Sequence, residues 1–388
     1  MIAPEVSGTY ATATENLETM GKSVFGRLFK RERKIPFFAW QVELTTRCPL
    51  RCRMCIRDSA RDWRAADMPI DNFGRLAPYF RNVENVVLEG WGEPLLYKDL
   101  TEAVKIVKDA GSHPGFITSG WGLTRDRIAD LVGNGLDFIG FSLAGATPET
   151  HASIRVNSDL SDIVEAIECF NRIKADNNLQ KPSMHIVFLV LRDNLAEIPP
   201  VLDLAKRIGI EVVVLINLAM VTNEWQNNQK IFTCDNRDSD PVLEEAEIKA
   251  AELGITLRQY RTSPQNLAVC EEDPLRNLFI SVDGEVAPCV YLHPPTTSGI
   301  KRIYCDHDVT MERLSFGNIF AKPLEHIWDS RDYAEFRGIL ASRKKKIEKL
   351  YSYDASSGSN AERLRMLRDE TLPDPPAPCR TCHRMLGL

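Results

Sequence analysis

The feature that most constrains this chain is a group of three cysteines within eight residues. Cys48, Cys52 and Cys55 have the spacing C-x3-C-x2-C and directly follow a strand-like run at residues 40–46. Cysteine thiolate is the usual protein ligand of a [4Fe–4S] cluster, so three thiolates on one loop can hold three corners of such a cluster. The fourth iron is then left without a protein ligand. We expect a metal–sulfur centre with one open coordination position, at which chemistry takes place.

Neither chance nor structural zinc accounts for the triplet as well as iron–sulfur ligation does. The chain has ten cysteines in 388 residues, and a random chain of that composition would show this spacing with a probability of about 1%. Structural zinc is the stronger rival, but zinc sites usually combine paired cysteine arms with a fourth ligand nearby. No histidine or fourth cysteine lies within fifty residues of the triplet. Iron–sulfur ligation therefore remains the favoured interpretation.

Composition indicates a globular intracellular enzyme. The apolar fraction is 44%, which permits a sizeable core, and the length suits one large domain and a smaller one. The net charge of −6 argues against a nucleic-acid binder, which would carry a basic surface. No apolar run approaches the ~18 residues of a membrane span, and the N-terminus lacks the apolar segment of a secretory signal. The cysteines are then metal ligands or free thiols rather than disulfides, and we expect a reducing cytoplasm.

Strand-like and helix-like segments alternate after the triplet. The predicted strands, rich in β-branched residues, cover residues 42–46, 83–89, 115–119, 138–143, 185–191 and 211–217. Amphipathic stretches lie between them at residues 100–110, 126–133, 163–174 and 196–207. Six strand-plus-helix units predict an α/β fold with a parallel sheet. A closed eight-unit barrel needs about 250 residues, so this shorter segment predicts a partial, six-stranded TIM-like barrel with its reactive loops at the C-terminal strand ends.

The triplet after the first strand resembles the signature of the radical S-adenosylmethionine (SAM) superfamily. This resemblance implies that the open iron binds the amino and carboxylate groups of SAM. One electron from the cluster then releases a 5′-deoxyadenosyl radical, which takes a hydrogen atom from the substrate. The residue before the last cysteine is commonly aromatic in the family and is Met54 here. Its thioether can still pack against the adenine or the cluster.

The same resemblance implies SAM contacts after the second strand. Gly90, Gly92 and Glu93 resemble the glycine-glycine-glutamate stretch of the family, in which backbone carbonyls and the glutamate accept hydrogen bonds from the SAM ammonium group. Glycine there lets the main chain approach a ligand closely. The alternative is an ordinary turn between a strand and a helix.

Further SAM contacts are implied at later strand ends. Ser119 stands in a Thr-Ser-Gly turn that resembles the Thr-Asn-Gly turn of the family, with serine in place of asparagine. Ser142 matches a position where the family often has a hydroxyl near the methionine or ribose. Arg192 and Asn194 end the fifth strand and resemble arginine and asparagine positions that contact SAM.

A second cysteine group lies toward the C-terminus. Cys270 is followed by Gly284 and Cys289 in the pattern C-x13-G-x4-C, which resembles the opening of the SPASM or twitch extension of radical SAM enzymes. Cys379 and Cys382 then supply a closing C-x2-C pair. Physically, Asp-Gly at 283–284 between two apolar runs is a strong signal for a β-hairpin. The hairpin is predicted to carry Cys289 back toward Cys270.

The number of cysteines limits what this second site can be. A full SPASM extension has seven or more cysteines for two auxiliary clusters, whereas the four matching residues here suffice for one fully ligated [4Fe–4S] cluster, as in a twitch domain. Such a cluster is expected to carry electrons. Zinc held by the same four thiolates stays open as an alternative, and so does Cys305 as a competing ligand. Cys169 and Cys234 are interpreted as bystanders.

These predictions define four regions. Residues 1–37 form an N-terminal extension, residues 38–220 the radical SAM partial barrel, residues 221–265 a bridging region, and residues 266–388 a smaller α+β twitch/SPASM-like domain.

The expected function is net oxidation or dehydrogenation of a small molecule, with electron transfer to the auxiliary [4Fe–4S] cluster. Only 47 residues precede Cys48, fewer than the recognition domain that often begins peptide-modifying relatives. Two alternatives stay open. One is radical oxidation, crosslinking or epimerisation of a peptide or protein side chain, and the other is a non-catalytic iron–sulfur electron carrier. A flavodoxin or ferredoxin is the expected electron donor. No general base can be assigned, although Tyr291 and His293 follow Cys289.

Overall fold

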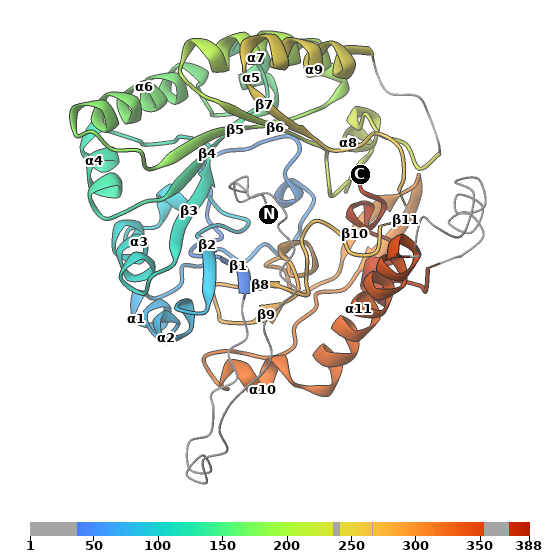
Figure 1. Cartoon of the computed structure of the whole chain (residues 1–388). Helices are drawn as coiled ribbons and strands as arrows, with labels where there is room; N and C mark the ends of the chain where they lie inside the picture. Colours follow the sequence, from blue (N-terminus) through green and yellow to red (C-terminus); the bar gives the residue numbers. More distant parts are fainter. Residues whose placement is uncertain (1–36, 236–240, 266, 353–371) are drawn as a thin grey trace.

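The computed structural model describes residues 37–235, 241–265, 267–352 and 372–388, so the expected N-terminal extension lies outside the described residues apart from Phe37. A nine-stranded sheet with the order β7-β6-β5-β4-β3-β2-β1-β8-β9 organises these residues. Neighbouring strands are parallel throughout, except for the antiparallel pair β8 and β9. Figure 1 shows the sheet curving around a central space, as expected for a partial barrel.

The six predicted barrel strands are present. Their bounds are β1 Phe37–Val42, β2 Val83–Val87, β3 His113–Thr118, β4 Phe138–Leu143, β5 Ser183–Leu189 and β6 Val212–Ile216. The predicted first strand, residues 42–46, was placed too late. Beyond Val42 the chain leaves the sheet, because Thr45 pairs with Asp67 in an isolated bridge and Thr46 donates its N–H to the Ala66 carbonyl at 2.9 Å.

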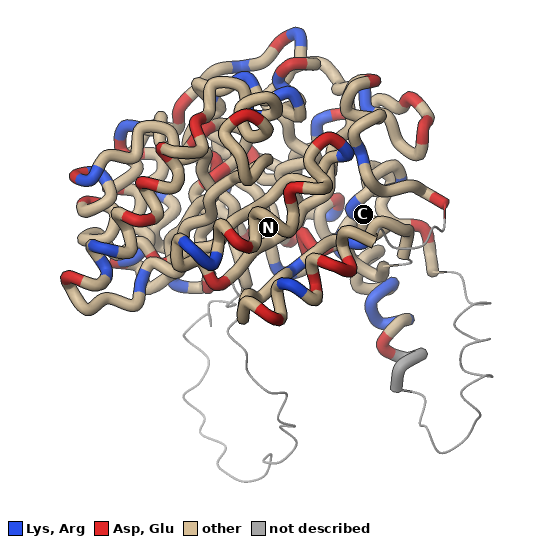
Figure 2. Tube along the Cα trace, turned by 90° about the horizontal axis from the view of Figure 1, so that it is seen from above, with Lys and Arg blue, Asp and Glu red and all other residues tan. Residues whose placement is uncertain are grey.

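Helices cover the outer face of the sheet (Figure 1). They are α1 Ile70–Gly74, α2 Ala77–Phe80, α3 Leu100–Asp109, α4 Arg125–Gly133, α5 Pro148–Ile154, α6 Leu160–Asp176, α7 Ile198–Arg207 and α9 Pro241–Leu253. Helix α3 illustrates why they form. Leu100, Ala103, Val104 and Val107 recur at three- and four-residue intervals and are all buried, so one apolar stripe packs inward. Figure 2 shows Lys/Arg and Asp/Glu residues interspersed over these outer elements.

The sheet continues beyond the six predicted strands at both edges. After α9, strand β7 (Thr256–Gln259) pairs with β6 within residues that the sequence indicated only as a bridge. At the other edge, β8 (Asn277–Ile280) pairs with β1, and β9 (Val286–Ala287) turns back on β8. The predicted hairpin is thereby confirmed. Its turn requires Gly284, whose φ is +85° and where an added Cβ would lie 2.3 Å from the Phe320 ring.

The remaining elements close the open side of the barrel. They are α8 Glu224–Gln229, the antiparallel pair β10 Ile300–Tyr304 and β11 His307–Met311, and the helices α10 Leu324–Trp328 and α11 Arg331–Ser352. Residues 372–388 lie beside α8 and the β10–β11 hairpin (Figure 1). No helix among the described residues is long and apolar enough to cross a membrane.

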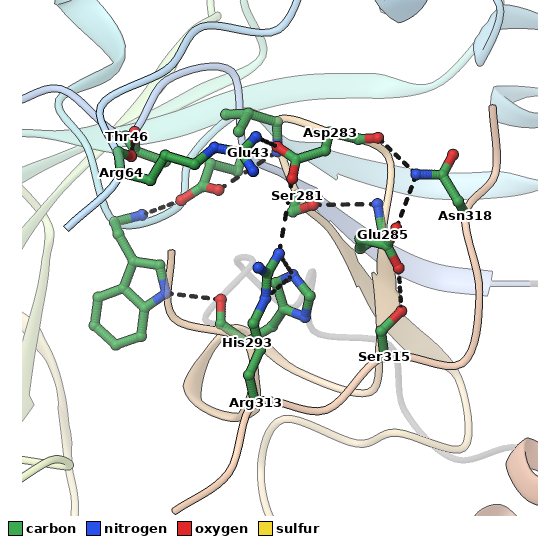
Figure 3. A network of polar contacts seen from close by, with 12 residues as sticks. Glu43, Thr46, Arg64, Ser281, Asp283, Glu285, His293, Arg313, Ser315 and Asn318 are labelled. Carbon is green, nitrogen blue, oxygen red and sulfur yellow. Dashed lines mark hydrogen bonds and ion pairs between the residues drawn. The ribbon is translucent and has the colours of Figure 1, made fainter. Parts of the chain in front are cut away.

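A polar network attaches the loop after β2 to both β1 and the C-terminal part of the chain (Figure 3). Glu43, just after β1, accepts the backbone N–H of Trp91 at 2.9 Å. The Trp91 indole N–H in turn donates to the carbonyl of His293 at 3.3 Å. Arg313 donates to the His293 ring at 2.8 Å and so fixes this residue from the other side. The 90–94 loop is therefore held between two distant parts of the chain.

The tip of the β8–β9 hairpin belongs to the same network. Asp283 forms an ion pair with Arg64 at 2.5 Å. Asn318 donates to the Asp283 carbonyl at 2.8 Å and to the Glu285 carboxylate at 2.9 Å. The hairpin is thus fastened on both sides of its turn.

Glu43 makes the stability of the fold dependent on pH. Burial raises its pKa from 4.5 to about 8, against the opposing hydrogen bond from Trp91. Between these two values the native state holds a proton that the unfolded chain releases, so this contribution to stability falls as pH rises from 4.5 to 8. We predict that the free energy of unfolding of wild type, minus that of Glu43→Gln, declines by roughly 2–4 kcal/mol between pH 5 and pH 8. Urea denaturation of both apo-proteins measures it, and a pH-independent difference contradicts the assignment.

Candidate active site

The three-cysteine loop begins at the C-terminal end of β1. Arg57 organises it by donating to the carbonyl of Cys48 at 2.8 Å and to the carbonyl of Leu50. Two backbone N–H groups of the loop, those of Arg51 and Arg53, donate to carbonyls of residues 154–156, just after α5, at 3.0 Å each. These bonds leave the cysteine side chains free to face inward.

The three thiols fit an iron–sulfur cluster. All three are free, and they line one cavity of about 390 Å³ together with Arg57 and Asp58. Burial raises the pKa of Cys48 to about 11 and also raises that of Cys55. A bound metal needs thiolates, and its positive charge offsets the cost of burying them. Among the described residues, no other cysteine or histidine lines this cavity, which matches a cluster with one iron free of protein ligands.

A second cavity, which we call the central cavity, joins the cysteine loop to the ends of the next strands. Its volume is about 330 Å³, within the range of small-ligand sites. The three cysteines and Met54 line it, and five of the seven SAM contacts implied by sequence do so too, namely Gly90, Gly92, Glu93, Ser119 and Ser142.

Glu93 is held rigidly at the edge of the central cavity. Its Oε1 accepts from the hydroxyl of Thr118 at 2.6 Å and from the N–H of Leu95 at 3.1 Å. Its Oε2 accepts from the N–H and the hydroxyl of Ser119 at 2.9 and 2.7 Å. A carboxylate offers about four lone-pair positions. The Thr-Ser-Gly turn therefore orients Glu93, and the Ser119 hydroxyl points to that carboxylate.

The structure gives a packing reason for the two glycines of the 90–94 loop. The sequence analysis had explained them by close approach of the main chain to a ligand. A Cβ on Gly92 would lie 2.3 Å from the carbonyl oxygen of Thr45 and 2.6 Å from that of Arg47. A Cβ on Gly90 would lie 2.5 Å from the side chain of Glu43. Glycine is thus required here because the loop packs against the segment that leads into the cysteines.

Arg192 and Asn194 are not brought to the central cavity. Arg192 is exposed and donates its Nε–H to the carbonyl of Lys230 at 3.1 Å. Asn194 is fully buried, and its amide bonds to Leu191, Ala144 and Leu189 of neighbouring turns. These two side chains therefore form hydrogen bonds to backbone groups instead of lining the cavity. Arg155, just after α5, does line the cavity.

The four C-terminal cysteines also gather into one site. Cys270, Cys289 and Cys379 are buried, and each acts electrostatically on others of the group, which includes Cys382. Burial raises the pKa of Cys270 to about 12, and it also raises the pKa values of Cys289 and Cys379. Three buried thiols and the half-buried thiol of Cys382 in one place fit a fully ligated cluster. Cys305 does not join them, because it is disulfide-bonded to Cys234. Both residues were misread from sequence, which assigned them no mutual partner.

Each of three C-terminal cysteines is followed, two residues later, by a side chain that lines the central cavity. These side chains are Glu272 after Cys270, Tyr291 after Cys289 and Arg384 after Cys382. Sequence reasoning missed Glu272 and Arg384, although the repeated offset was a visible signal. His293, the other residue considered there, does not line the cavity, because it is buried in the network of Figure 3.

Arg384 contributes a buried cation to the lining of the central cavity. Its guanidinium lies 4.1 Å from the ring centroid of Tyr260, and its Nη2 donates to the Tyr291 hydroxyl at 3.2 Å. Its Nε and Nη1 have no hydrogen-bond partner among the described residues, although the side chain is buried. A buried cation with free donors is suited to fix a polar group of a ligand.

A third carboxylate, after Glu93 and Glu272, lines the central cavity. Glu89, two residues beyond β2, lines it beside Gln41, and its Oε2 accepts the N–H of Ile117 at 2.7 Å. Burial raises its pKa from 4.5 to about 7, and the nearby carboxylates of Glu272 and Glu93 add to the rise. A carboxyl group with a pKa near neutrality can exchange a proton at working pH.

Comparison with known proteins assigns the family. Residues 42–224 match the radical SAM superfamily, and residues 270–352 match the SPASM iron–sulfur cluster-binding domain. The chain is 27% identical over 303 residues to a tungsten-containing aldehyde ferredoxin oxidoreductase cofactor-modifying protein of Pyrococcus furiosus, covering 77% of this chain and 82% of that protein. It is also 27% identical over 316 residues to a PqqA peptide cyclase of Streptomyces rochei, covering 76% and 77%.

Solved structures share the fold. SuiB of Streptococcus suis bound to S-adenosylmethionine has a TM-score of 0.57 at 14% identity and covers 79% of this chain and 68% of its own. The enzyme anSMEcpe with bound AdoMet and Cp18Cys peptide has a TM-score of 0.56 at 15% identity, with coverages of 79% and 84%. The two family matches identify residues 42–224 as a radical SAM domain and residues 270–352 as a SPASM-type domain, so the chain is a radical SAM enzyme. SAM, a [4Fe–4S] cluster and auxiliary iron–sulfur ligation come with this assignment.

The close approach at Gly92 predicts that a single methyl group disrupts the cysteine loop. Gly92→Ala places its Cβ against two backbone carbonyls that cannot move without displacing residues 45–47. We expect iron incorporation at the first site to fall at least several-fold after anaerobic reconstitution, and the protein to lose roughly 1–3 kcal/mol of stability. Iron analysis and thermal unfolding measure the two effects.

Gly74→Ala is the matched control, because nothing lies within 4 Å of a Cβ added there. This variant should keep its iron and its stability. Normal iron content in Gly92→Ala would show that the 90–94 loop does not depend on this contact.

Proposed function

We propose that this enzyme oxidises a small molecule by hydrogen abstraction followed by transfer of one electron to an auxiliary [4Fe–4S] cluster. The observation that carries the proposal is that residues of both cysteine groups contribute to the lining of the central cavity. The thiols of the first site line the central cavity directly, and three C-terminal ligand cysteines each contribute the side chain two residues on. A substrate in this cavity would lie between the two cysteine groups.

The cofactors supply the radical chemistry when bound, because SAM at the first cluster yields the hydrogen-abstracting radical and the auxiliary cluster takes up an electron. The chain supplies the ligands and the shape. We assign Cys48, Cys52 and Cys55 to the first cluster and Cys270, Cys289, Cys379 and Cys382 to the auxiliary cluster. Gly90, Gly92, Glu93, Ser119 and Ser142 are the proposed SAM contacts, and Glu93 and Ser119 would exchange their mutual hydrogen bonds for those to SAM. Arg192 and Asn194 are not retained in this role, since both lie outside the cavity lining.

Glu89 is the proposed proton acceptor. Removing a hydrogen atom and then an electron leaves a proton on the substrate, which must go to a base. The Oε2 of Glu89 accepts the N–H of Ile117, whereas its Oε1 has, among the residues that the structure describes, only the long contact to Gln41 at 3.4 Å. Oε1 is therefore the atom available to take the proton. Arg384, which lines the same cavity, is suited to orient a polar group of the same substrate.

Peptide modification remains a second candidate. Relatives named as PqqA peptide cyclases, and a structure of SuiB bound to the precursor peptide SuiA, act on or bind peptides. The cavity volume of about 330 Å³ favours a small substrate, or a single side chain inserted from a larger one. The electron-carrier alternative is dropped, because the family assignment makes the protein an enzyme. A flavodoxin or ferredoxin donor and a cytoplasmic location remain predictions.

The assignment of ligands predicts an iron count. Anaerobically reconstituted wild type should contain about eight irons and eight sulfides per chain, and the double variant Cys379→Ala/Cys382→Ala about four of each. Chemical iron and sulfide analysis measures this. The Cys169→Ala variant is the control, since Cys169 is a buried residue of α6 without a ligand role, and it should keep the full count. An unchanged count in the double variant contradicts the auxiliary site, and zinc in place of iron there would identify the rival metal.

Net oxidation of the substrate predicts that the auxiliary cluster becomes reduced during turnover. The enzyme is reduced with limiting reductant and given SAM with the low-molecular-weight fraction of a cell extract or, separately, with its peptide fraction. We expect the small-molecule fraction to stimulate 5′-deoxyadenosine formation, and the EPR signal of a reduced auxiliary cluster to grow in proportion to it. In Glu89→Gln, formation of oxidised product should fall about 10²–10⁴-fold while unstimulated SAM cleavage persists. Stimulation by peptides alone, or without auxiliary-cluster reduction, contradicts net small-molecule oxidation.

A further inference from the structure

A second sulfur pair lies outside both proposed cluster sites. Cys234 and Cys305 are bonded to each other, and one ring nitrogen of His383 lies within 4.8 Å of both sulfurs. Both cysteines are partly exposed, whereas His383 is buried between the rings of Phe232 and Tyr304. The radical chemistry does not use this group.

Cys305 occupies a backbone position that cysteine rarely takes. It forms the two-residue turn of the β10–β11 hairpin with Asp306, and their φ values are +46° and +64°. Such turns favour glycine, asparagine and aspartate, because other residues are strained at positive φ. The strain at Cys305 is offset by local contacts, namely the disulfide and the ion pair between Asp306 and Lys230 at 2.5 Å. A cysteine in a strained backbone conformation at a surface turn indicates that its sulfur has a function.

The partner cysteine, Cys234, lies near the end of a segment that contacts the loop of the first cysteine group. We call residues 221–235, which contain α8, the α8 segment. Its Gln226 donates to the carbonyl of Arg53, between two cluster cysteines, at 3.3 Å. The Arg53 guanidinium lies 4.1 Å from the ring centroid of Trp225. Thr222 donates to the Ser59 hydroxyl at 2.8 Å, just beyond the cysteine triplet.

The other side of the α8 segment contacts the C-terminal domain. Ile303 of β10 donates its N–H to the carbonyl of Val221 at 2.7 Å. Phe232 packs edge-on against His383, whose neighbour in sequence is Cys382. The α8 segment thus spans from the loop of the first cysteine group to that of the second, and the Cys234–Cys305 bond is its covalent attachment.

We propose that Cys234 and Cys305 form a thiol–disulfide exchange site that reacts with low-molecular-weight disulfides and thiols, and that fastens or releases the α8 segment. In the oxidising direction, one cysteine thiolate attacks a small disulfide RSSR, forming a mixed disulfide and releasing RS⁻. The second cysteine thiolate then attacks the mixed disulfide, which forms the Cys234–Cys305 bond and releases the second RS⁻. The cysteine pair loses two electrons and two protons, and the small disulfide gains the electrons. Reduction by two RSH molecules reverses both steps.

The site's position gives the exchange a consequence. The disulfide closes a loop across 71 residues of sequence, and opening it removes a covalent constraint on the chain between them. Without it, the α8 segment is held by non-covalent contacts, among them the Lys230–Asp306 ion pair, so its local opening becomes easier. The same segment contacts both cysteine groups, and its release is expected to loosen their loops.

The test is a redox titration of the reconstituted, full-length enzyme in anaerobic glutathione buffers of increasing GSSG content. Samples are denatured, alkylated and mapped by mass spectrometry. We expect Cys234 and Cys305 to lose alkylation together over one midpoint, while iron content stays constant. Hydrogen exchange of residues 221–235 and 300–311 should be roughly tenfold faster on the reduced side.

Two variants sharpen the outcome. Cys234→Ser should abolish the paired change, leave Cys305 able to form a glutathione adduct, and show fast exchange in every buffer. Cys169→Ser, which removes an unrelated buried thiol, should titrate like wild type. The proposal is overturned if both cysteines stay alkylatable at all ratios, if the bond resists glutathione entirely, or if the enzyme holds about one zinc per chain that Cys234→Ser loses, since the sulfurs would then serve a metal site.

Discussion

The burial of two sets of thiols around one cavity is the constraint on which the rest of this structure depends. A thiol buried without a metal stays protonated, and burial raises the pKa of Cys48 to about 11 and of Cys270 to about 12. Iron binding must remove those protons, so cluster assembly and local folding are thermodynamically linked. The surrounding structure contributes by holding the sulfurs in place. The Arg57 bonds to the first loop and the β8–β9 hairpin beside the second do this.

The two thiol groups are coupled through one chain of contacts. Glu43 at the end of β1 holds Trp91, and Trp91 holds His293 in the C-terminal domain (Figure 3). Strand β8 pairs directly with β1, so the C-terminal domain continues the barrel sheet. This geometry explains how side chains next to the C-terminal cysteines reach the cavity of the first site. Arg384 is the clearest case, since it is buried, stacked on Tyr260 and left with two free donors among the residues that the structure describes.

Sequence predicted the parts that follow from local pattern. The alternation of β-branched and amphipathic segments located the barrel strands, and Asp-Gly at 283–284 located the hairpin. The cysteine spacing predicted the first sulfur group, whose three members share one loop. The second group combines cysteines from distant parts of the chain and was predicted from the family resemblance. The end of β1 was missed because Leu44 and Thr45 have strand-like character, and only the pairing of Thr45 with Asp67 takes them out of the sheet.

The rest of the site depends on contacts that sequence does not contain. Short strands such as β7 form because β6 offers an unpaired edge. Arg192 and Asn194 matched the family pattern for SAM contacts, but in the structure their side chains donate to backbone carbonyls. Cys234 and Cys305 are 71 residues apart and come together only through the β10–β11 turn. Glu89 acquires its raised pKa from burial beside Glu272, which no spacing in the sequence could indicate.

The open iron of the first cluster can be tested by electron–nuclear double resonance on the reduced cluster with SAM labelled with ¹⁵N in its amino group. The Cys379→Ala/Cys382→Ala background removes the overlapping auxiliary signal. A cluster held by Cys48, Cys52 and Cys55 alone has one iron open to the cofactor, so we predict a resolved coupling between that cluster and the ¹⁵N nucleus. A reduced cluster with no such coupling at saturating SAM would contradict it.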